Sequence, residues 1–335
     1  MLQNTHLSMR GTLTPDPSSL IPAPDVSVLV PAKDEAENLP LFMEQAAAAF
    51  TADPGTRYEV VVIDDGSVDD TARVLRDLEQ RYAFLRVARH RSQRGIADAL
   101  RTGYLAGRGR VLVFYPADLQ FKPEDIPRLV APILADEADM VTGFKQGEYD
   151  KAFVSGVYNR LSRSLFDVKV RDLNSVKAYR REVMDALPVR PDWHRYMVVI
   201  AAAQGFAVTE IPVPLYPRHA GKSKFASWRR IPIGVLDMLA VWFELQFGQK
   251  PLLAFGMLGA ALFAIGALAG ITALIVLALT GFGIRPVWTV IQTCLILGSI
   301  FFATGLLGEQ IAGQRAEMRD LRRRLDETFT PPSDR

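Results

Sequence analysis

The chain has 335 residues, of which 49% are apolar and 23% charged, and its formal net charge is +2. At roughly 150 residues per domain this length allows about two domains. The balance of apolar and charged residues excludes a disordered chain and one that coats nucleic acid, so we expect an ordered protein with no nucleic-acid partner.

Neither a disulfide nor a structural zinc site is expected. Cys294 is the single cysteine, so it cannot form an intramolecular disulfide. The four histidines are scattered and lack zinc-ligand spacing. Residues 1–24 place four prolines among serine and threonine and have no apolar core before a cleavage site, so we predict a disordered tail and not a signal peptide.

Short apolar runs begin after this tail. They cover residues 26–30, 60–63 and 111–114 and are separated by stretches of helical length. This alternation predicts βαβ units and therefore a mostly parallel sheet, in an α/β domain over residues 25–227. In open α/β sheets, ligands bind outside the carboxyl ends of the strands, so the loops after these runs are the candidate site.

The C-terminal part of the sequence predicts a membrane hairpin. No charged residue occurs between Lys250 and Arg285. Residues 251–279 and 286–308 are each long enough to cross roughly 30 Å of hydrocarbon as helices, so we predict two transmembrane helices within residues 251–309. Arginine and lysine flank the pair on its outer sides, which predicts a multi-pass protein of the inner (cytoplasmic) membrane with both termini in the cytoplasm.

Three further features belong to this region. Residues 228–250 mix tryptophan and phenylalanine with charges, which is typical of an amphipathic helix lying in the membrane interface, although an ordinary buried helix has the same composition. Residues 310–335 are charge-dense and predict a cytosolic helix and tail. Gly266 and Gly270 would permit close helix pairing, or they face lipid by chance.

The loop after the third apolar run carries a candidate metal site. Asp118 and Gln120 alternate by two, so a persisting strand geometry would point both side-chain oxygens to one place. Oxygen ligands with open water positions suit Mg²⁺ or Mn²⁺ bound to a diphosphate. Taken alone, the same residues are also compatible with a surface turn.

The loops after the first two runs are rich in carboxylates. Asp64 and Asp65 are adjacent at a strand end, where they would repel each other unless something binds there, and nucleobase N–H groups or ribose hydroxyls are suitable partners. The segment from Lys33 to Glu37 is also acidic, although it is compatible with a simple helix start. All three loops share one sheet edge, which favours a common site.

Together these motifs resemble family 2 glycosyltransferases with a GT-A fold, which is Rossmann-like. The motifs are Val28-Leu-Val-Pro-Ala-Lys-Asp-Glu35, Val62-Ile-Asp-Asp-Gly-Ser67, the helix from Arg94 to Gly107, and Ala117-Asp-Leu-Gln120. The segments around 171–179, 205–213 and 218–224, with the terminal hairpin, resemble more narrowly the polyprenyl-phosphate glycosyltransferases of the dolichyl-phosphate mannose synthase and GtrB type. The resemblance covers about residues 26–309.

The resemblance implies a role for each matching residue. Pro31, Lys33, Glu35, Asp64, Asp65 and Asp118 would bind the nucleotide sugar, and Asp118 with Gln120 would hold the metal. The lipid phosphate would contact Lys145, Lys151, Ser155 and Arg218. The catalytic residues would be Asp118, Arg218 and Lys224.

Two positions depart from the family pattern. Pro116 stands where the family usually has an aspartate two residues before the metal aspartate, and Asp34 stands where asparagine is usual. Proline removes one carboxylate and one backbone N–H, so either the remaining oxygens suffice for the cation or the activity is altered.

The resemblance therefore implies a metal-dependent hexosyltransferase. It would transfer a sugar, with inversion, from a UDP- or GDP-linked donor to a polyprenyl monophosphate of the undecaprenyl or dolichyl type, at the cytoplasmic membrane face. The alternatives are a catalytically inactive GT-A-like membrane scaffold and a glycosyltransferase with another lipid acceptor. A homo-oligomer is a hypothesis, and the sugar, the base and the prenyl chain length stay open.

Overall fold

The structure is a computed structural model that describes residues 23–146, 166, 170–186, 193–220, 230–248, 250–281 and 285–329. The chain divides into two compact units, residues 1–228 and 229–335. This division lies one residue from the predicted end of the α/β domain at residue 227.

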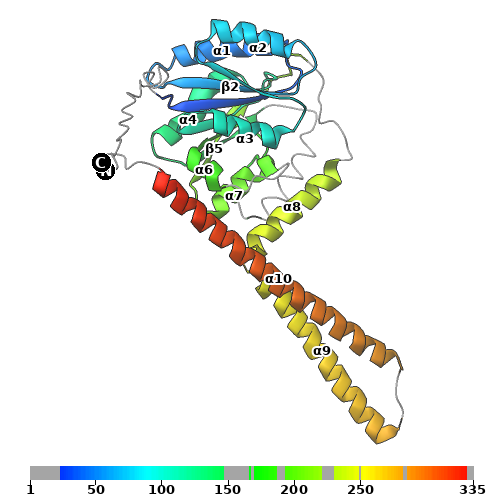
Figure 1. The fold of residues 1–335 in the computed structure, drawn as a ribbon. Helices are drawn as coiled ribbons and strands as arrows, with labels where there is room; N and C mark the ends of the chain where they lie inside the picture. The colour runs from blue at the N-terminus through cyan, green and yellow to red at the C-terminus, as the bar shows by residue number, and fades with distance from the viewer. Residues whose placement is uncertain are drawn as a thin grey trace, which may run out of the picture. The chain divides into compact units, whose positions relative to one another are not determined.

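The first unit is built on one sheet with helices packed around it (Figure 1). The sheet has seven strands in the order β3-β2-β1-β4-β6-β5-β7. All strands run parallel except β6, which is antiparallel to both of its neighbours. The predicted α/β fold with a mostly parallel sheet is confirmed. The strands are β1 (Val26–Ala32), β2 (Tyr58–Asp65), β3 (Leu85–His90), β4 (Val111–Phe114), β5 (Met140–Gln146), β6 (Lys177–Arg180) and β7 (Val208–Pro214).

Helices cover both faces of this sheet. Alternate residues of β1, β2 and β4 pack in one core cluster with helices α1, α2 and α4. On the opposite face, α3 lies against Leu29 and Ile63, because Gly103 leaves room for their side chains. The helices of this unit are α1 (Leu39–Thr51), α2 (Thr71–Arg81), α3 (Ile96–Ala106), η2 (Pro123–Asp125), α4 (Ile126–Leu134), α6 (Arg181–Ala186), η3 (Trp193–Tyr196) and α7 (Met197–Ala203).

Burial on both faces explains why the central strands are continuous apolar runs. Every residue of β2 is buried, as expected for a parallel strand between two helical layers. The outermost strand β3 is different, since its middle residues are partly exposed. The core therefore lies on both faces of β1, β2 and β4, the strands whose carboxyl ends carry the candidate site.

The second unit contains α8 (Arg230–Phe247), α9 (Pro251–Thr280) and α10 (Arg285–Phe329). Within α9 and α10, the segments Pro251–Thr280 and Pro286–Met318 are long and apolar enough to cross a membrane. Most of their large apolar side chains are exposed, which distinguishes them from core helices of a soluble protein. The exposed apolar side chains of α8 include Leu236, Leu239 and Phe243, which share one face at helical spacing.

Glycines allow α9 and α10 to pack closely. A Cβ atom at Gly259 would lie 2.8 Å from Gly298 O, and one at Gly298 would lie 3.0 Å from Gly259 O. Gly266 faces Cys294 in the same way, whereas Gly270 has looser contacts with Ile291. The glycines of α9 thus serve pairing within the hairpin.

The second apolar span continues directly into the charged segment. We expected the transmembrane helices within residues 251–309 and a charged cytosolic helix and tail over residues 310–335. The structure shows one uninterrupted helix, α10, of 45 residues. The side chains become more charged along this helix, but the charged part has no proline or glycine turn that would end it.

Candidate functional site

The site is built at the carboxyl edge of β1, β2 and β4. Strands β1 and β2 are paired up to Ala32 and Asp64, so the loops that follow them start side by side. Strand β4 pairs with the other side of β1 and ends at Phe114, just before the loop that carries Asp118. The register therefore brings together the three loops that the sequence singled out.

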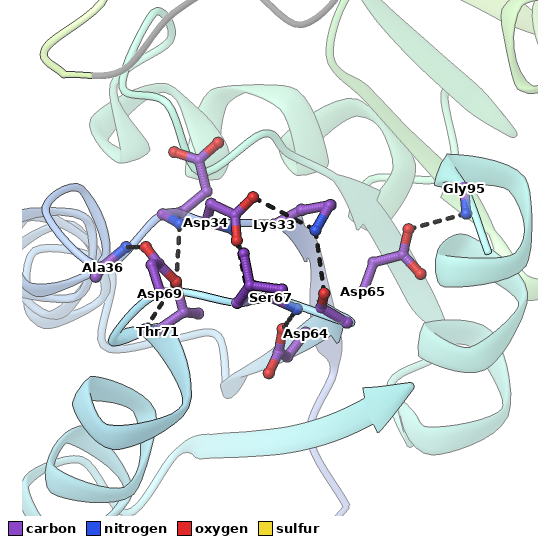
Figure 2. Close-up of polar contacts among 12 residues, drawn as sticks. Lys33, Asp34, Ala36, Asp64, Asp65, Ser67, Asp69, Thr71 and Gly95 are labelled. Carbon is purple, nitrogen blue, oxygen red and sulfur yellow. Dashed lines mark hydrogen bonds and ion pairs between the residues drawn. The ribbon is translucent and has the colours of Figure 1, made fainter. Parts of the chain in front are cut away.

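The first two loops hold each other by polar contacts (Figure 2). Lys33 Nζ donates to Gly66 O at 3.0 Å, and the Asp34 N–H donates to Ser67 Oγ at 2.9 Å. In return, the Val68 N–H donates to Asp34 Oδ1 at 2.8 Å. Asp34 therefore links the two loops through both its backbone N–H and its carboxylate.

Glu35 and Pro31 belong to the same loop region. The Glu35 N–H donates to Thr71 Oγ1 at 2.9 Å, and Glu35 Oε2 accepts from Asn38 Nδ2 at 2.6 Å. Pro31 lies in β1 opposite Ile63, one residue before the end of the strand. Both residues therefore lie at the carboxyl end of β1.

Asp64 is fully buried at the end of β2. Its Oδ1 accepts the Ser67 N–H at 2.9 Å. Arg89 Nε lies 3.1 Å from Oδ2 and forms an ion pair with it, but the contact lacks hydrogen-bond geometry. Among the described residues, Oδ2 therefore has no hydrogen-bond donor, although the ion pair with Arg89 balances its charge.

Asp65 turns away from this cluster toward α3, as Figure 2 shows. Its carboxylate contacts His90 Nδ1 at 2.7 Å and accepts the N–H groups of Arg94 and Gly95, each at 2.8 Å. Burial raises the pKa of Asp65, but these hydrogen bonds outweigh it and hold the pKa below its usual value.

The contacts of Asp65 correct the argument that two adjacent carboxylates need a ligand. The protein itself supplies the partners of Asp65, because His90 lies directly opposite in the β2–β3 pairing. His90 was not identified from the sequence; only its register in β3 indicates the contact. Asp65 fixes the start of α3, whereas Asp64 forms an ion pair with Arg89.

Asp118 and Gln120 converge on one arginine. Arg218 Nη2 lies 2.8 Å from Asp118 Oδ2 and donates to Gln120 Oε1 at 3.2 Å. The expected strand geometry does not persist, because β4 ends at Phe114 and Leu119 has a left-handed φ of 57°. A turn, and not an extended strand, brings the two oxygens together.

This donor pair fits a divalent cation. A carboxylate oxygen and an amide oxygen that both contact one nitrogen are suitable ligand types for one Mg²⁺ or Mn²⁺, and water and diphosphate would fill the remaining positions. Within the described parts of the chain no group of three or more acidic, histidine or cysteine side chains forms a metal cluster, in agreement with proline at position 116. Burial raises the pKa of Asp118, while Arg218 opposes this effect.

Lys145 lies at the end of β5 and contacts Asp172. Its Nζ lies 3.2 Å from Asp172 Oδ2 and donates to Asn174 O at 2.8 Å. A second lysine, Lys177, is fully buried nearby, and burial lowers its pKa to about 7 although Asp172 opposes this. The sequence reasoning missed Lys177, since nothing in a four-residue strand marks a lysine as buried.

Three other predicted site residues, Lys151, Ser155 and Lys224, lie outside the described residues. Their roles stay predictions. The structure thus brings Asp118, Gln120 and Arg218 into direct contact, and it places the first two loops of the site against each other.

Comparisons with known proteins show the family of this chain. The family model "Glycosyl transferase family 2" matches residues 27–184. Undecaprenyl-phosphate 4-deoxy-4-formamido-L-arabinose transferase of Klebsiella pneumoniae is 30% identical over 292 residues, which cover 83% of this chain and 85% of that protein. The chain belongs to glycosyl transferase family 2.

Two further proteins are similar to this glycosyltransferase, one in sequence and one in fold. Dodecaprenyl-phosphate galacturonate synthase of Rhizobium johnstonii is 29% identical over 297 residues, covering 83% of this chain and 85% of that one. A crystal structure of glucosyl-3-phosphoglycerate synthase from Mycobacterium tuberculosis, in complex with Mn²⁺, UDP and phosphoglyceric acid, has a TM-score of 0.51 at 20% identity. It covers 64% of this chain and 78% of that chain, and it confirms the GT-A fold of the glycosyltransferase.

Proposed function

We propose that this glycosyltransferase transfers a sugar from a nucleotide diphosphate sugar, UDP- or GDP-linked, to a polyprenyl monophosphate at the cytoplasmic face of a membrane. The observation that carries the proposal is the extent of the match to a protein named as an undecaprenyl-phosphate transferase. It covers 83% of the chain and thus reaches well beyond the family domain of residues 27–184.

The chemistry of the acceptor suits the residues at the sheet edge. A phosphate monoester has a second pKa near 6, so at neutral pH the nucleophile is largely a dianion. No general base is needed to deprotonate it. The reaction instead needs positive charge that lets this dianion approach a sugar whose leaving group is also anionic.

Basic side chains of the chain supply that charge. Arg218 lies beside Asp118, and Lys145 lies near the carboxyl end of β5, which is separated from β4 by β6 in the sheet. We assign Lys145, with Lys151 and Ser155, to the acceptor phosphate, and Arg218 with Lys224 to the phosphates of both substrates. Attack in line with the leaving diphosphate inverts the anomeric centre.

The donor would lie along the loops of β1, β2 and β4. Pro31, Lys33, Glu35 and Asp64 would border the nucleoside, at the paired ends of β1 and β2. Asp65 would act through the loop that it fixes at the start of α3. Mg²⁺ or Mn²⁺ held by Asp118 and Gln120 would neutralise the negative charge that develops on the leaving diphosphate.

The apolar helices would keep the reaction beside the lipid. Segments 251–280 and 286–318 are long enough to span a bilayer, and arginines after the second one favour cytoplasmic ends. The exposed apolar face of α8 suits the membrane interface. In this arrangement both termini lie in the cytoplasm and the prenyl chain stays in the bilayer.

A donor screen followed by a transfer assay tests the proposal. Full-length protein in detergent with Mn²⁺ is heated with each of a set of UDP- and GDP-sugars, because a ligand that binds only the native state raises the melting temperature. The stabilising donor is then incubated with polyprenyl phosphate, and the Asp118→Ala variant is the control. A lipid-linked sugar with the wild type alone supports the proposal; no lipid product with any stabilising donor contradicts it.

A further inference from the structure

Arg218 lies at the position where a cation bound by Asp118 and Gln120 would lie. One of its nitrogens, Nη2, is within 2.8 Å of Asp118 Oδ2 and within 3.2 Å of Gln120 Oε1. Both side chains of the ion pair are largely buried, with 24% of Arg218 and 12% of Asp118 exposed. Solvent therefore screens this ion pair only partly.

The segment 215–220 fixes Arg218 at this place. The Leu215 N–H donates to Gln146 O at 3.0 Å, and the Tyr216 N–H donates to Gln120 O at 2.9 Å. Lys122 Nζ also lies 4.2 Å from the centre of the Tyr216 ring. The backbone is therefore attached to the metal loop two residues before Arg218, and the arginine side chain can change partner while this attachment stays.

A guanidinium and a divalent cation cannot share these two oxygens. Mg²⁺ binds oxygen at about 2.0–2.1 Å, so a metal on Asp118 Oδ2 would be in contact with a guanidinium nitrogen placed as Arg218 Nη2 is. The two positive charges would also repel each other in a partly buried place. Binding of the metal therefore requires that Arg218 leave Asp118.

A nucleotide diphosphate gives Arg218 a new partner. Phosphate oxygens accept two parallel hydrogen bonds from a guanidinium, a stronger and more specific contact than Lys can make. Without the diphosphate, an arginine displaced from Asp118 would lose a charge-assisted contact and gain only water. The cost of displacing Arg218 is thus high for the metal alone and low for the metal together with the nucleotide.

We infer that Arg218 is an exchangeable counter-ion of Asp118, which competes with the divalent cation in the free enzyme and moves to the diphosphate when metal and nucleotide bind. The inference rests on the proposed function, because it needs both ligands at this sheet edge. It makes Arg218 the residue that couples the two binding events. By linkage, the metal must strengthen nucleotide binding by the same factor as the nucleotide strengthens metal binding.

The test is the affinity of Mn²⁺ for full-length protein in detergent, measured by isothermal titration calorimetry without nucleotide and with saturating UDP, or GDP if UDP does not bind. In Arg218→Gln the competitor is gone, so the dissociation constant for Mn²⁺ without nucleotide falls about tenfold, in the usual range of coupling between sites. The gain in Mn²⁺ affinity on adding the nucleotide shrinks by a similar factor.

Two further variants serve as controls. Arg57→Gln removes the same charge at the opposite, amino end of the sheet, where Arg57 pairs with Asp25, and leaves both Mn²⁺ affinities unchanged. Arg218→Lys keeps a cation on a shorter donor without the planar fork, so its Mn²⁺ affinities lie between those of wild type and Arg218→Gln. The lysine variant also gives an answer if the glutamine variant does not fold.

The outcomes separate this inference from the proposed function. Unchanged or weaker Mn²⁺ binding to Arg218→Gln without nucleotide, or to Arg218→Lys if only that variant folds, overturns the exchange. It leaves the transferase proposal standing if nucleotide still binds. Failure of wild-type protein to bind either nucleotide with Mn²⁺ removes both.

Discussion

Lys177 offers a stability prediction that can be worked out from its burial. The side chain is fully buried, and its Nζ donates to Ser175 O at 2.7 Å. Burial lowers its pKa from 10.5 to about 7, against an opposing effect of Asp172. In the unfolded chain a lysine titrates near 10.4, so between pH 7 and pH 10 the unfolded state binds a proton that the folded state does not.

The sign and size of the effect follow from this difference. Stability rises with pH wherever the unfolded state binds more protons, so raising the pH from 7 to 9 stabilises the fold through Lys177 by about 2 kcal/mol. For a domain of 150–250 residues this corresponds to roughly 4–8 °C in melting temperature. Lys177→Met removes the titrating group, while Asp172 keeps its ion pair with Lys145.

The assay is thermal unfolding of full-length wild type and Lys177→Met in detergent at pH 7 and pH 9. Other groups titrate equally in both proteins, so the difference between them isolates Lys177. We expect the melting temperature of the wild type to rise relative to the variant by roughly 4–8 °C between these pH values. Lys122→Met, at a partly exposed lysine, should follow the wild type. Parallel pH profiles of wild type and Lys177→Met would refute the reasoning.

Asp118→Ala should abolish stimulation of sugar transfer by Mg²⁺ or Mn²⁺, and stimulation as in the wild type would remove the metal assignment. Lys145→Ala should raise the KM for polyprenyl phosphate with little change in donor affinity; an unchanged acceptor KM would argue against its role. His90→Ala should raise the KM for the donor several-fold, since it loosens the loop before α3, and unaltered donor kinetics would contradict this. Gly259→Ala should destabilise the helical hairpin by about 1–3 kcal/mol through overpacking, whereas Gly313→Ala, with no atom within 4 Å of its added Cβ, should not.

The parts of the fold that follow from burial were predictable. Strands β1, β2 and β4 are buried on both faces, so each of them forms an apolar run in the sequence. The outer strand β3 was missed, because its exposed Arg86 and Arg89 interrupt the apolar run. Short apolar runs predict the centre of such a sheet far better than its edge.

The site was predictable in its residue types but not in its contacts. Asp118 and Gln120 were expected to converge through strand geometry, and they converge through a turn and a shared contact with Arg218. Asp65 was expected to need a ligand, and its partner His90 comes from the register of two strands. Contacts between residues far apart in sequence are set by the tertiary structure, which local patterns do not report.

The continuity of the apolar and charged parts of the last helix could not be seen from the sequence. Charge density predicts where a helix leaves an apolar environment, but a helix ends only where its backbone hydrogen bonding ends. Helix α10 therefore continues from its apolar part through its charged part to Phe329.

The most direct measurement is the anomeric configuration of the product made by full-length protein in detergent from its stabilising nucleotide sugar and polyprenyl phosphate. The proposal predicts one lipid-phosphate sugar, formed only with the divalent cation present, whose configuration by NMR is inverted relative to the donor. A product with retained configuration, or sugar released to water with no lipid-linked product, would contradict it.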